Sequence, residues 1–328
     1  MEIGTGLPTQ YPAGESPRAA AASIRRIASV VEESGFDSVW VGEHHVTSEF
    51  HYFHNVPVLG MLASATESVD IGAGAILLPL HNPVNVAEMG ATIDVLSGGR
   101  FRAAFGLGYR EAEYDAFGVD IADRVGRLEE GIEVVKRLWT DGETSFDGEH
   151  YQLSGVETNP RPLQEPAPPV YVAGFVDAAC ERAGRLGDSW LAGPLAERTE
   201  LARQMDVYER AVADHDRRDA CLPPTVVREG FVLPDGEAAF ETVRPYLQDK
   251  YESYSAWGLE DADFEEGFRE VAADRFLIGS PSDVLEELEA YADLGIENVV
   301  FRVHYPGMDV DDVVRCLHTL GDDVLPDV

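Results

Sequence analysis

The segment from residue 43 to residue 54 concentrates histidine and carboxylate side chains. It reads EHHVTSEFHYFH and contains Glu43, His44, His45, Glu49, His51 and His54. Imidazole exchanges protons near neutral pH and is a common metal ligand. Adjacent side chains on an extended segment point to opposite sides, and the spacing matches no HExxH motif, so we expect no metal site here. One imidazole, of His44 or His45, is the candidate proton donor, proton acceptor or anion stabiliser. The alternative is that both rings are hydrogen-bonded scaffold groups.

Two stretches of small residues indicate a place where a flat molecule approaches the main chain. The first, Gly72–Ala75, lies inside an expected strand, and the second contains Gly106 and Gly108. Glycine weakens a strand, so its use is explained if a planar ring lies against the backbone. Such a slot would be lined by three leucines, Leu77, Leu78 and Leu107. Tight packing between neighbouring strands is the alternative explanation, and the two do not exclude each other.

Two turns that open helices are candidates for binding a phosphate. The turn Gly174-Phe175-Val176-Asp177 leads directly into an expected helix at 178–186, whose free N–H groups would hold an anion. Asp177 is a natural N-cap, and its carboxylate would compete with a phosphate. The second turn is 278–281, with Ser280 as the N-cap. Most such turns are only helix caps, so each signal by itself is weak.

The elements that must position these residues alternate between buried strands and helices. Eight short runs are nearly continuous in Val, Ile, Leu and Ala, as in strands that are buried on both faces. They are Glu2–Thr5, Ser38–Val41, Val69–Leu78, Phe101–Phe105, Val170–Ala173, Ser189–Ala192, Val226–Leu233 and Asn298–Val303. Eight β-then-α units predict an α/β fold, a closed (β/α)8 TIM barrel, whose functional groups gather at the C-terminal ends of the strands. An open doubly wound sheet is the runner-up, but no GxGxxG follows the first strand.

Amphipathic stretches between these runs are typical of the outer helices of a barrel. They are Ala19–Glu33, Val84–Leu96, Arg124–Trp139, Ala178–Leu186, Glu197–Ala213 and Asp283–Asp293. Left-handed C-caps are expected at Gly35, Gly98, Gly187 and Gly295. We expect one domain over residues 1–328, with insertions at about 142–169 and 234–275 on the C-terminal rim. The first should contain a hairpin that turns at Asp147-Gly148. The second, rich in aromatic residues, is expected to act as a lid, and the alternative is a rigid structural appendage.

The composition excludes several kinds of partner. The 328 residues include 60 Asp or Glu and 25 Lys or Arg, a formal net charge of −35, so nucleic acid and anionic membrane surfaces are unfavourable partners. No run reaches about 18 apolar residues, so no membrane-spanning helix is expected. The three cysteines, Cys180, Cys221 and Cys316, form no CxxC motif and fit a reducing cytoplasm.

An acidic surface with so few lysines, Lys136 and Lys250 alone, is typical of a protein from a salt-loving organism such as a halophilic archaeon. High salt shortens the Debye length to a few Å and makes the self-repulsion of this charge tolerable. We therefore expect the melting temperature to rise by several degrees as KCl is increased from low to molar concentration. A melting temperature that stays constant or falls over that range would contradict a halophilic origin.

A long central string is similar to that of a known family. It runs from Leu62 to Gly118 and reads LASATESVDIGAGAILLPLHNPVNVAEMGATIDVLSGGRFRAAFGLGYREAEYDAFG. Its DVLSGGRF segment, together with GFDSVWVGEHH (35–45), PPVYVAG (168–174) and FLIGSPSDVLEELEAYADLGIENVVF (276–301), resembles the bacterial luciferase-like monooxygenase family. The resemblance spans nearly the whole chain. It implies a (β/α)8 barrel that binds reduced FMN or the deazaflavin coenzyme F-420 without covalent attachment, often as a homodimer.

The resemblance also implies roles for single residues. His44, with His45 beside it, would lie next to the isoalloxazine ring and the substrate. An unusual backbone, often with a cis non-proline peptide, is implied against the ring near Ile76, Leu77 and Leu78. The other positions that would contact the cofactor are Gly6, Glu43, Gly106, Leu107, Gly108, Gly174 and Phe175. Of these, Gly174 and Phe175 would offer amides to the phosphate.

Four positions depart from the pattern of the family, and two of them, Phe175 and Asp177, stand where small hydroxyl residues are commoner at the phosphate. Luciferase itself has a phosphate-binding arginine where this chain has Leu107. The glutamate that serves catalysis in the deazaflavin-dependent sugar-phosphate dehydrogenases aligns with Tyr109, and its neighbour Glu111 is the candidate substitute. Tyr109 and Glu111 therefore join His44 and His45 as candidate catalytic residues.

Four functions are compatible with the sequence. The first is a two-component monooxygenase, in which a separate flavin reductase supplies reduced FMN that reacts with oxygen and then with an unidentified small organic substrate. The second is a hydride-transfer oxidoreductase that uses F-420 and no oxygen. The third is a non-catalytic flavin-binding protein, and the fourth is a metal-dependent barrel hydrolase that uses the histidine cluster. The EHH motif favours the first.

Overall fold

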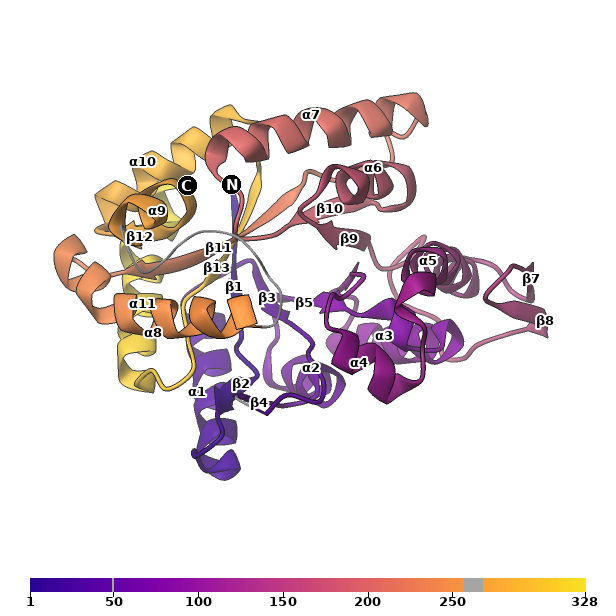
Figure 1. Ribbon diagram of the computed structural model, residues 1–328, viewed down its shortest axis with the longest axis horizontal. Coiled ribbons are helices and arrows are strands. Elements are labelled where there is room, and N and C mark those ends of the chain that lie inside the picture. Colours follow the sequence, from indigo (N-terminus) through magenta and orange to yellow (C-terminus); the bar gives the residue numbers. More distant parts are fainter. Residues whose placement is uncertain (49, 257–267) are drawn as a thin grey trace.

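Eight parallel strands close into a barrel at the centre of the molecule (Figure 1). The computed structural model describes residues 1–48, 50–256 and 268–328. Around the barrel, the strands are β1 (Glu2–Gly6), β3 (Ser38–Val41), β5 (Asp70–Ile76), β6 (Phe101–Phe105), β9 (Val170–Gly174), β10 (Ser189–Ala192), β11 (Thr225–Val232) and β13 (Asn298–Arg302). β13 pairs with β1, for example Val300 with Gly4, and this pairing closes the barrel. The predicted (β/α)8 TIM barrel is therefore confirmed, with its strands where the apolar runs predicted them.

Helices surround the barrel (Figure 1). The six predicted helices are present as α1 (Pro17–Glu33), α3 (Pro83–Ser97), α5 (Arg124–Thr140), α6 (Asp177–Leu186), α7 (Arg198–Asp214) and α10 (Pro281–Asp293). Three further helices were not predicted, α2 (Asn55–Ala65), α4 (Glu111–Phe117) and α11 (Val310–Asp323). α2, which reads NVPVLGMLASA, is apolar around most of its circumference, so it lacks the periodicity by which a surface helix is recognised.

Three of the four predicted glycine caps are confirmed. Gly35, Gly98 and Gly295 have φ angles of +80°, +74° and +81°. The prediction for Gly187 is wrong, because its φ is −79°. A Cβ at position 187 would lie only 2.7 Å from the carbonyl oxygen of Ser189. Glycine is required there because the chain folds back closely as it enters β10, and not because the conformation is left-handed.

The first insertion forms the predicted hairpin, from β7 (Thr144–Asp147) and β8 (Gln152–Val156). It follows α5 in the chain and projects beyond that helix, at the right of Figure 1. Glu130 of α5 accepts the backbone N–H groups of residues 149–151 at 2.8–3.0 Å, which fixes the turn. We expected the insertion on the C-terminal rim. Instead it packs along α5 and meets the rim near its turn, where the Tyr151 hydroxyl lies 3.5 Å from the carbonyl oxygen of His81.

The second insertion contains α8 (Gly236–Ala256) and α9 (Phe268–Arg275), followed by β12 (Leu277–Gly279), which pairs with β11. Two of the aromatic residues of the expected lid, Trp257 and Phe264, lie outside the described residues. Two others, Tyr251 and Phe268, are buried, and the Tyr251 ring stacks on Phe276 with centroids 5.7 Å apart. The described part of this insertion is therefore packed against the body of the protein. Nowhere in the described chain is a helix both long and apolar enough to cross a bilayer.

The interior of the barrel is filled by a hydrophobic cluster that is separate from the main core. Its members are Trp40, Ala104, Tyr171, Leu191 and Val300, with Ala75, Ala173 and Val227 packed against them. A Cβ at Gly72 would lie 2.1 Å from Trp40 Cδ2, and one at Gly74 would lie 2.8 Å from Trp40 Cε3. These two glycines therefore make room for the indole, as the packing alternative predicts. The expected slot for a flat ring does not lie at this level of the barrel.

Candidate active site at the barrel mouth

The C-terminal end of the barrel is built from residues with almost no side chain. Side chains alternate between the two faces of a strand, so residues two positions beyond the interior cluster also face inward. These residues are Gly42, Gly106, Ala173, Gly193, Glu229 and Arg302. Together with Gly6 on β1 and Ala75 on β5, they form what we call the mouth layer. A Cβ at Gly106 would lie 3.3 Å from the Cβ of Ala75 and 3.7 Å from that of Ala173, which supports this placement. Six of the eight positions are glycine or alanine.

The mouth layer can accept a flat group against its backbone. Apart from buried Gly106, its glycines and alanines are half-buried, whereas Trp40 and Tyr171 below them are buried. The level one layer above Gly72 is therefore where the main chain lacks large side chains. A cis peptide joins Gly74 to Ala75, just before the segment 76–78 where the resemblance implied one.

The three leucines expected to line the slot are placed differently. Leu77 packs with Leu80 and Tyr114 in a small buried cluster. Leu78 is fully buried and approaches Gly131 of α5, and half-buried Leu107 packs against the main core. Gly108 has a φ of +74°, and a Cβ there would meet Leu77 at 3.4 Å. These residues therefore shape the loops around the mouth layer through their packing.

His44 is held at the mouth by a buried carboxylate. Its Nδ1 lies 3.1 Å from Glu113 Oε1, and the same oxygen accepts the backbone N–H of His45 at 2.8 Å. Arg110 donates to this oxygen at 3.2 Å. Burial alone would raise the pKa of the Glu113 carboxyl, but His44, the His45 amide and Arg110 lower it below its ordinary value. Glu113 is therefore ionised at neutral pH and can orient the His44 ring.

Two tyrosines lie beside the His44 ring. The Tyr52 ring, on β4 (Phe50–Tyr52), has its centroid 5.3 Å from that of His44, and the Tyr109 centroid is 5.9 Å away. β4 pairs with β2 (Gln10–Pro12), so this small sheet positions Tyr52. Of the four candidate catalytic residues, His44 and Tyr109 are thus brought together, whereas the His45 ring lies near His81 and Phe117. Glu111 is exposed in the first turn of α4.

The carboxylate at His44 is therefore Glu113, which the sequence analysis did not single out. Glu111 and Glu113 both stand at the start of an unrecognised helix, and nothing in their types distinguishes the exposed one from the buried one. Glu113 could have been recognised as a site residue only because Glu113 and Tyr114 belong to the string that resembles the family.

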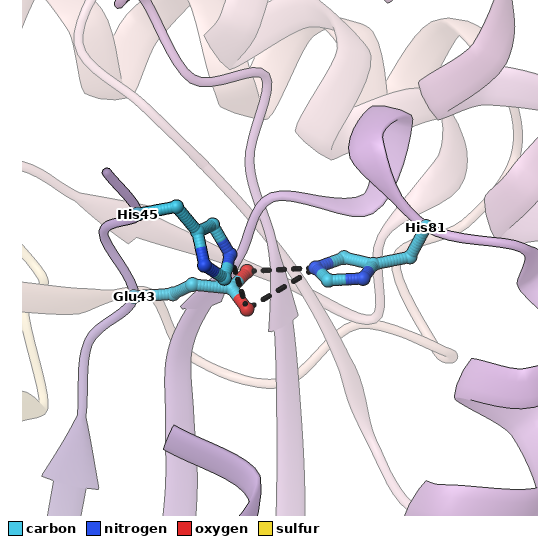
Figure 2. Close-up of side chains that lie close together, drawn as sticks. All are labelled: Glu43, His45 and His81. Carbon is cyan, nitrogen blue, oxygen red and sulfur yellow. Dashed lines mark hydrogen bonds and ion pairs between the residues drawn. The ribbon is translucent and has the colours of Figure 1, made fainter. Parts of the chain in front are cut away.

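His45 belongs to a second cluster, with Glu43 and His81 (Figure 2). Glu43 Oε2 accepts the backbone N–H of Leu77 at 2.6 Å, and Oε1 lies 3.1 Å from Nε2 of both His45 and His81. Burial alone would raise the pKa of Glu43, but the contacts with the two histidines and with the Leu77 amide lower it strongly. The ionised carboxylate thus fixes the backbone directly after β5, where the mouth layer ends.

The cluster of Glu43, His45 and His81 could hold a metal ion, whereas no metal site was expected in residues 43–54. One ligand atom from each of Glu43, His45 and His81 lies within 4.8 Å of the others, so the three have the donor set of a two-histidine, one-carboxylate site. His81 comes from the loop after β5, so spacing within residues 43–54 could not reveal this convergence. His81 Nε2 is hydrogen-bonded to Glu43, whereas buried His45 Nε2 lies 3.1 Å from Glu43 Oε1 without a hydrogen bond of good geometry. The absence of a metal here therefore stays a prediction.

The turn at 174–178 is the better of the two phosphate candidates. Its residues 175–178 are exposed, and the carbonyl oxygens of Gly174 and Phe175 are held by Trp190 Nε1 at 2.9 Å and Gln204 Nε2 at 2.8 Å. The N-cap is Val176 rather than the predicted Asp177, whose carboxylate pairs with Arg203 at 2.9 Å. The start of α6 is therefore exposed, with the Asp177 carboxylate drawn toward Arg203 beside it.

The other turn, 278–281, is closed by the protein itself. Ser280 is the N-cap as predicted, but Asp283 completes a capping box and accepts the Ser280 N–H at 2.8 Å. A Cβ at Gly279 would lie 2.9 Å from that carboxylate. A phosphate there would meet a negative charge, so this candidate is withdrawn.

Two cavities lie away from the mouth layer. One, of about 570 Å³, lies between α8, α9 and α10, and the other, of about 680 Å³, lies near Glu2 and Arg102 at the opposite end of the barrel. Neither is lined by His44 or Glu113. The mouth layer is therefore identified by its composition, its exposure and the charged groups beside it.

Known proteins resemble this chain over most of its length. The sequence profile of the luciferase-like monooxygenase family matches residues 1–298. The oxygenase component of the flavin-dependent trigonelline monooxygenase of Acinetobacter baylyi is 25% identical, over 92% of this chain and 88% of its own. The F420-dependent glucose-6-phosphate dehydrogenase of Amycolatopsis mediterranei is 29% identical, over 90% and 91%. In fold, the monooxygenase RslO1 of Streptomyces bottropensis superposes with a TM-score of 0.89, at 23% identity over 99% of both chains.

Proposed function

Because the chain belongs to the luciferase-like monooxygenase family, we propose that it is a flavin-dependent monooxygenase that uses reduced FMN and oxygen to oxidise a small organic substrate. One observation carries the proposal. The His44–Glu113 pair lies at the end of a barrel whose mouth layer is mostly glycine and alanine. This combination offers a proton-transfer group next to a surface on which a planar ring can rest.

The residues present fit the cofactor in two respects. A Cβ at Gly106 would fill the space beside Ala75 and Ala173, so the backbone at this level is open to a ring only because the position is glycine. The exposed start of α6 offers a site for the phosphate of FMN. Bound reduced FMN would supply the electrons with which oxygen is activated.

In this proposal, the chain's own residues position the reactants and move protons. Glu113 binds Nδ1 of His44, so exchange of a proton with the bound reactants is assigned to Nε2. Glu43 holds the backbone N–H of Leu77 and thereby sets the position of the wall formed by Ala75. Tyr109 and Tyr52 flank the His44 ring and exclude water from it.

We further propose a separate flavin reductase as the partner that delivers reduced FMN, in keeping with the name of the Acinetobacter relative, an oxygenase component. The homodimer and the cytoplasmic location stay predictions. Cys180, Cys221 and Cys316 are unpaired, which is compatible with a reducing compartment.

The second candidate is hydride transfer with F-420, and the relative at 29% identity favours it. The same mouth layer would accept a deazaflavin, because both cofactors are flat tricyclic rings. The presence of Tyr109, where the resembled sugar-phosphate dehydrogenases carry a catalytic glutamate, argues for the first candidate.

Anaerobic titration of the purified protein with reduced FMN and with reduced F-420, in parallel, tests the proposal. We expect FMN to bind at least about tenfold more tightly, a difference of about 1.4 kcal/mol. Oxygen should then be consumed by the FMN complex, with product formed from a panel of small organic substrates.

The other outcomes are distinct. Tighter binding of F-420 would replace the monooxygenase by the hydride-transfer enzyme. Retention of FMN without turnover on any substrate would support the non-catalytic binding protein. Binding of neither cofactor would contradict both enzymatic assignments.

A further inference from the structure

Two charged residues complete the mouth layer. Glu229 on β11 and Arg302 on β13 are direct neighbours in the strand register. Glu229 is fully buried, whereas the Arg302 side chain is 30% exposed. The Arg302 guanidinium forms an ion pair with Glu229 Oε1 through Nη2. Arg302 is therefore the member of this pair that a bound molecule can reach.

The Glu229 carboxylate is fixed from a second side by α8. Lys250 Nζ and the Tyr251 hydroxyl donate to Oε1 at 2.7 and 2.8 Å. Burial alone would raise the pKa of Glu229, but Arg302 and Lys250 lower it, so the carboxylate stays ionised. A buried carboxylate held in this way gives the Arg302 guanidinium a defined orientation.

Arg302 crosses the mouth layer on the side of β1. Its Cγ would lie 3.1 Å from a Cβ at Gly6, so its stem crosses the layer directly above β1. In the closed strand order, β13 is four strands away from β6, so Arg302 lies across the barrel from Gly106. A ring that rests on Ala75 and Gly106 would therefore have this guanidinium on the opposite side of the mouth.

We propose that Arg302 binds the pyrimidine edge of the flavin or deazaflavin ring and stabilises the negative charge that reduction places there; this rests on the proposed function. Two-electron reduction increases the charge on the N1–C2=O side of the ring. A guanidinium presents planar donors that match a carbonyl oxygen, and a partly buried cation acts more strongly than one in water. Arg302 thus binds the reduced form of the cofactor better than the oxidised form.

The test compares three variants with the wild type. Arg302→Met removes the cation and keeps most of the apolar stem, and Arg302→Lys keeps the charge. Lys250→Met also removes a cation from Glu229, but one that is on α8 and almost fully buried, so it is the matched control. The dissociation constants of oxidised and reduced FMN are measured anaerobically for each, together with the reduction potential of the bound cofactor.

We expect Arg302→Met to weaken reduced FMN about tenfold more than oxidised FMN, equivalent to a potential about 30 mV lower for a two-electron couple. Arg302→Lys should recover most of the loss, and Lys250→Met should change the ratio by less than about threefold. If Arg302→Met does not fold, Arg302→Gln keeps a hydrogen-bond donor for Glu229, whose charge Lys250 still balances, and should show the same change in ratio.

An unchanged ratio in a folded Arg302 variant would overturn the inference while the proposed function stands. If the wild type binds reduced F-420 rather than FMN, the same comparison is made with that cofactor, whose ring has the same pyrimidine edge. Binding of neither cofactor by the wild type would remove the proposed function, and this inference with it.

Discussion

Replacing His44 by alanine is expected to lower turnover by about 10²–10⁴-fold, the range that a positioned acid–base group contributes. The affinity for reduced FMN should change by less than about threefold, because the mouth layer and the α6 amides are untouched. Turnover should fall because the contact between His44 Nδ1 and buried Glu113 assigns proton exchange to the other nitrogen of the His44 ring. Product formation and anaerobic cofactor titration, measured on the same preparation, separate the two effects.

Glu113→Gln is the matched companion of this variant. The amide oxygen can still accept from His44, but it carries no charge to orient the ring, so turnover should fall by about 10–100-fold, as for other residues that support a functional histidine. Equal turnover in wild type and His44→Ala, with equal binding, would show that the assignment of His44 is wrong.

Gly106→Val is expected to weaken cofactor binding at least about 100-fold, or about 2.7 kcal/mol. A Cβ at this position already lies 3.3 Å from the Cβ of Ala75 and 3.7 Å from that of Ala173, so two further methyl groups must enter the space proposed for the ring. Overpacking should also cost about 1–3 kcal/mol of stability. Anaerobic titration gives the affinity, and thermal unfolding shows how much of the protein is folded.

Substitutions at two other glycines, Gly72 and Gly108, serve as comparisons for Gly106→Val. Gly72→Ala would bring a Cβ within 2.1 Å of the Trp40 indole, so it should lower the melting temperature while the folded fraction binds cofactor normally. Gly108→Val is a poorer probe, because φ is +74° there and a Cβ would meet Leu77 and Tyr114 in the loop. Unchanged affinity in folded Gly106→Val would show that the ring does not rest on this wall.

The fold could be predicted because each strand and most helices carry a local signal. Buried parallel strands are continuous apolar runs, and eight of them alternated with amphipathic stretches. The His44 segment was also local, because all its candidate residues lie within 12 positions. Within the site, by contrast, the features that were missed depend on neighbouring strands or loops.

Three features of the site needed the structure for this reason. Gly72 and Gly106 look alike in the sequence, yet an indole from the adjacent strand covers the first and the second faces only alanines. Glu43 and His81 are 38 positions apart and meet through two loops. Glu229 and Arg302 are 73 positions apart and become neighbours only through the register of β11 with β13.

The indole of Trp40 has a further consequence, because it forms the floor directly beneath the mouth layer. Its emission band overlaps the absorption of a flavin, and efficient energy transfer requires only that the donor and acceptor be close. The protein therefore carries its own optical reporter: quenching of intrinsic fluorescence would follow occupancy of the site without any added label.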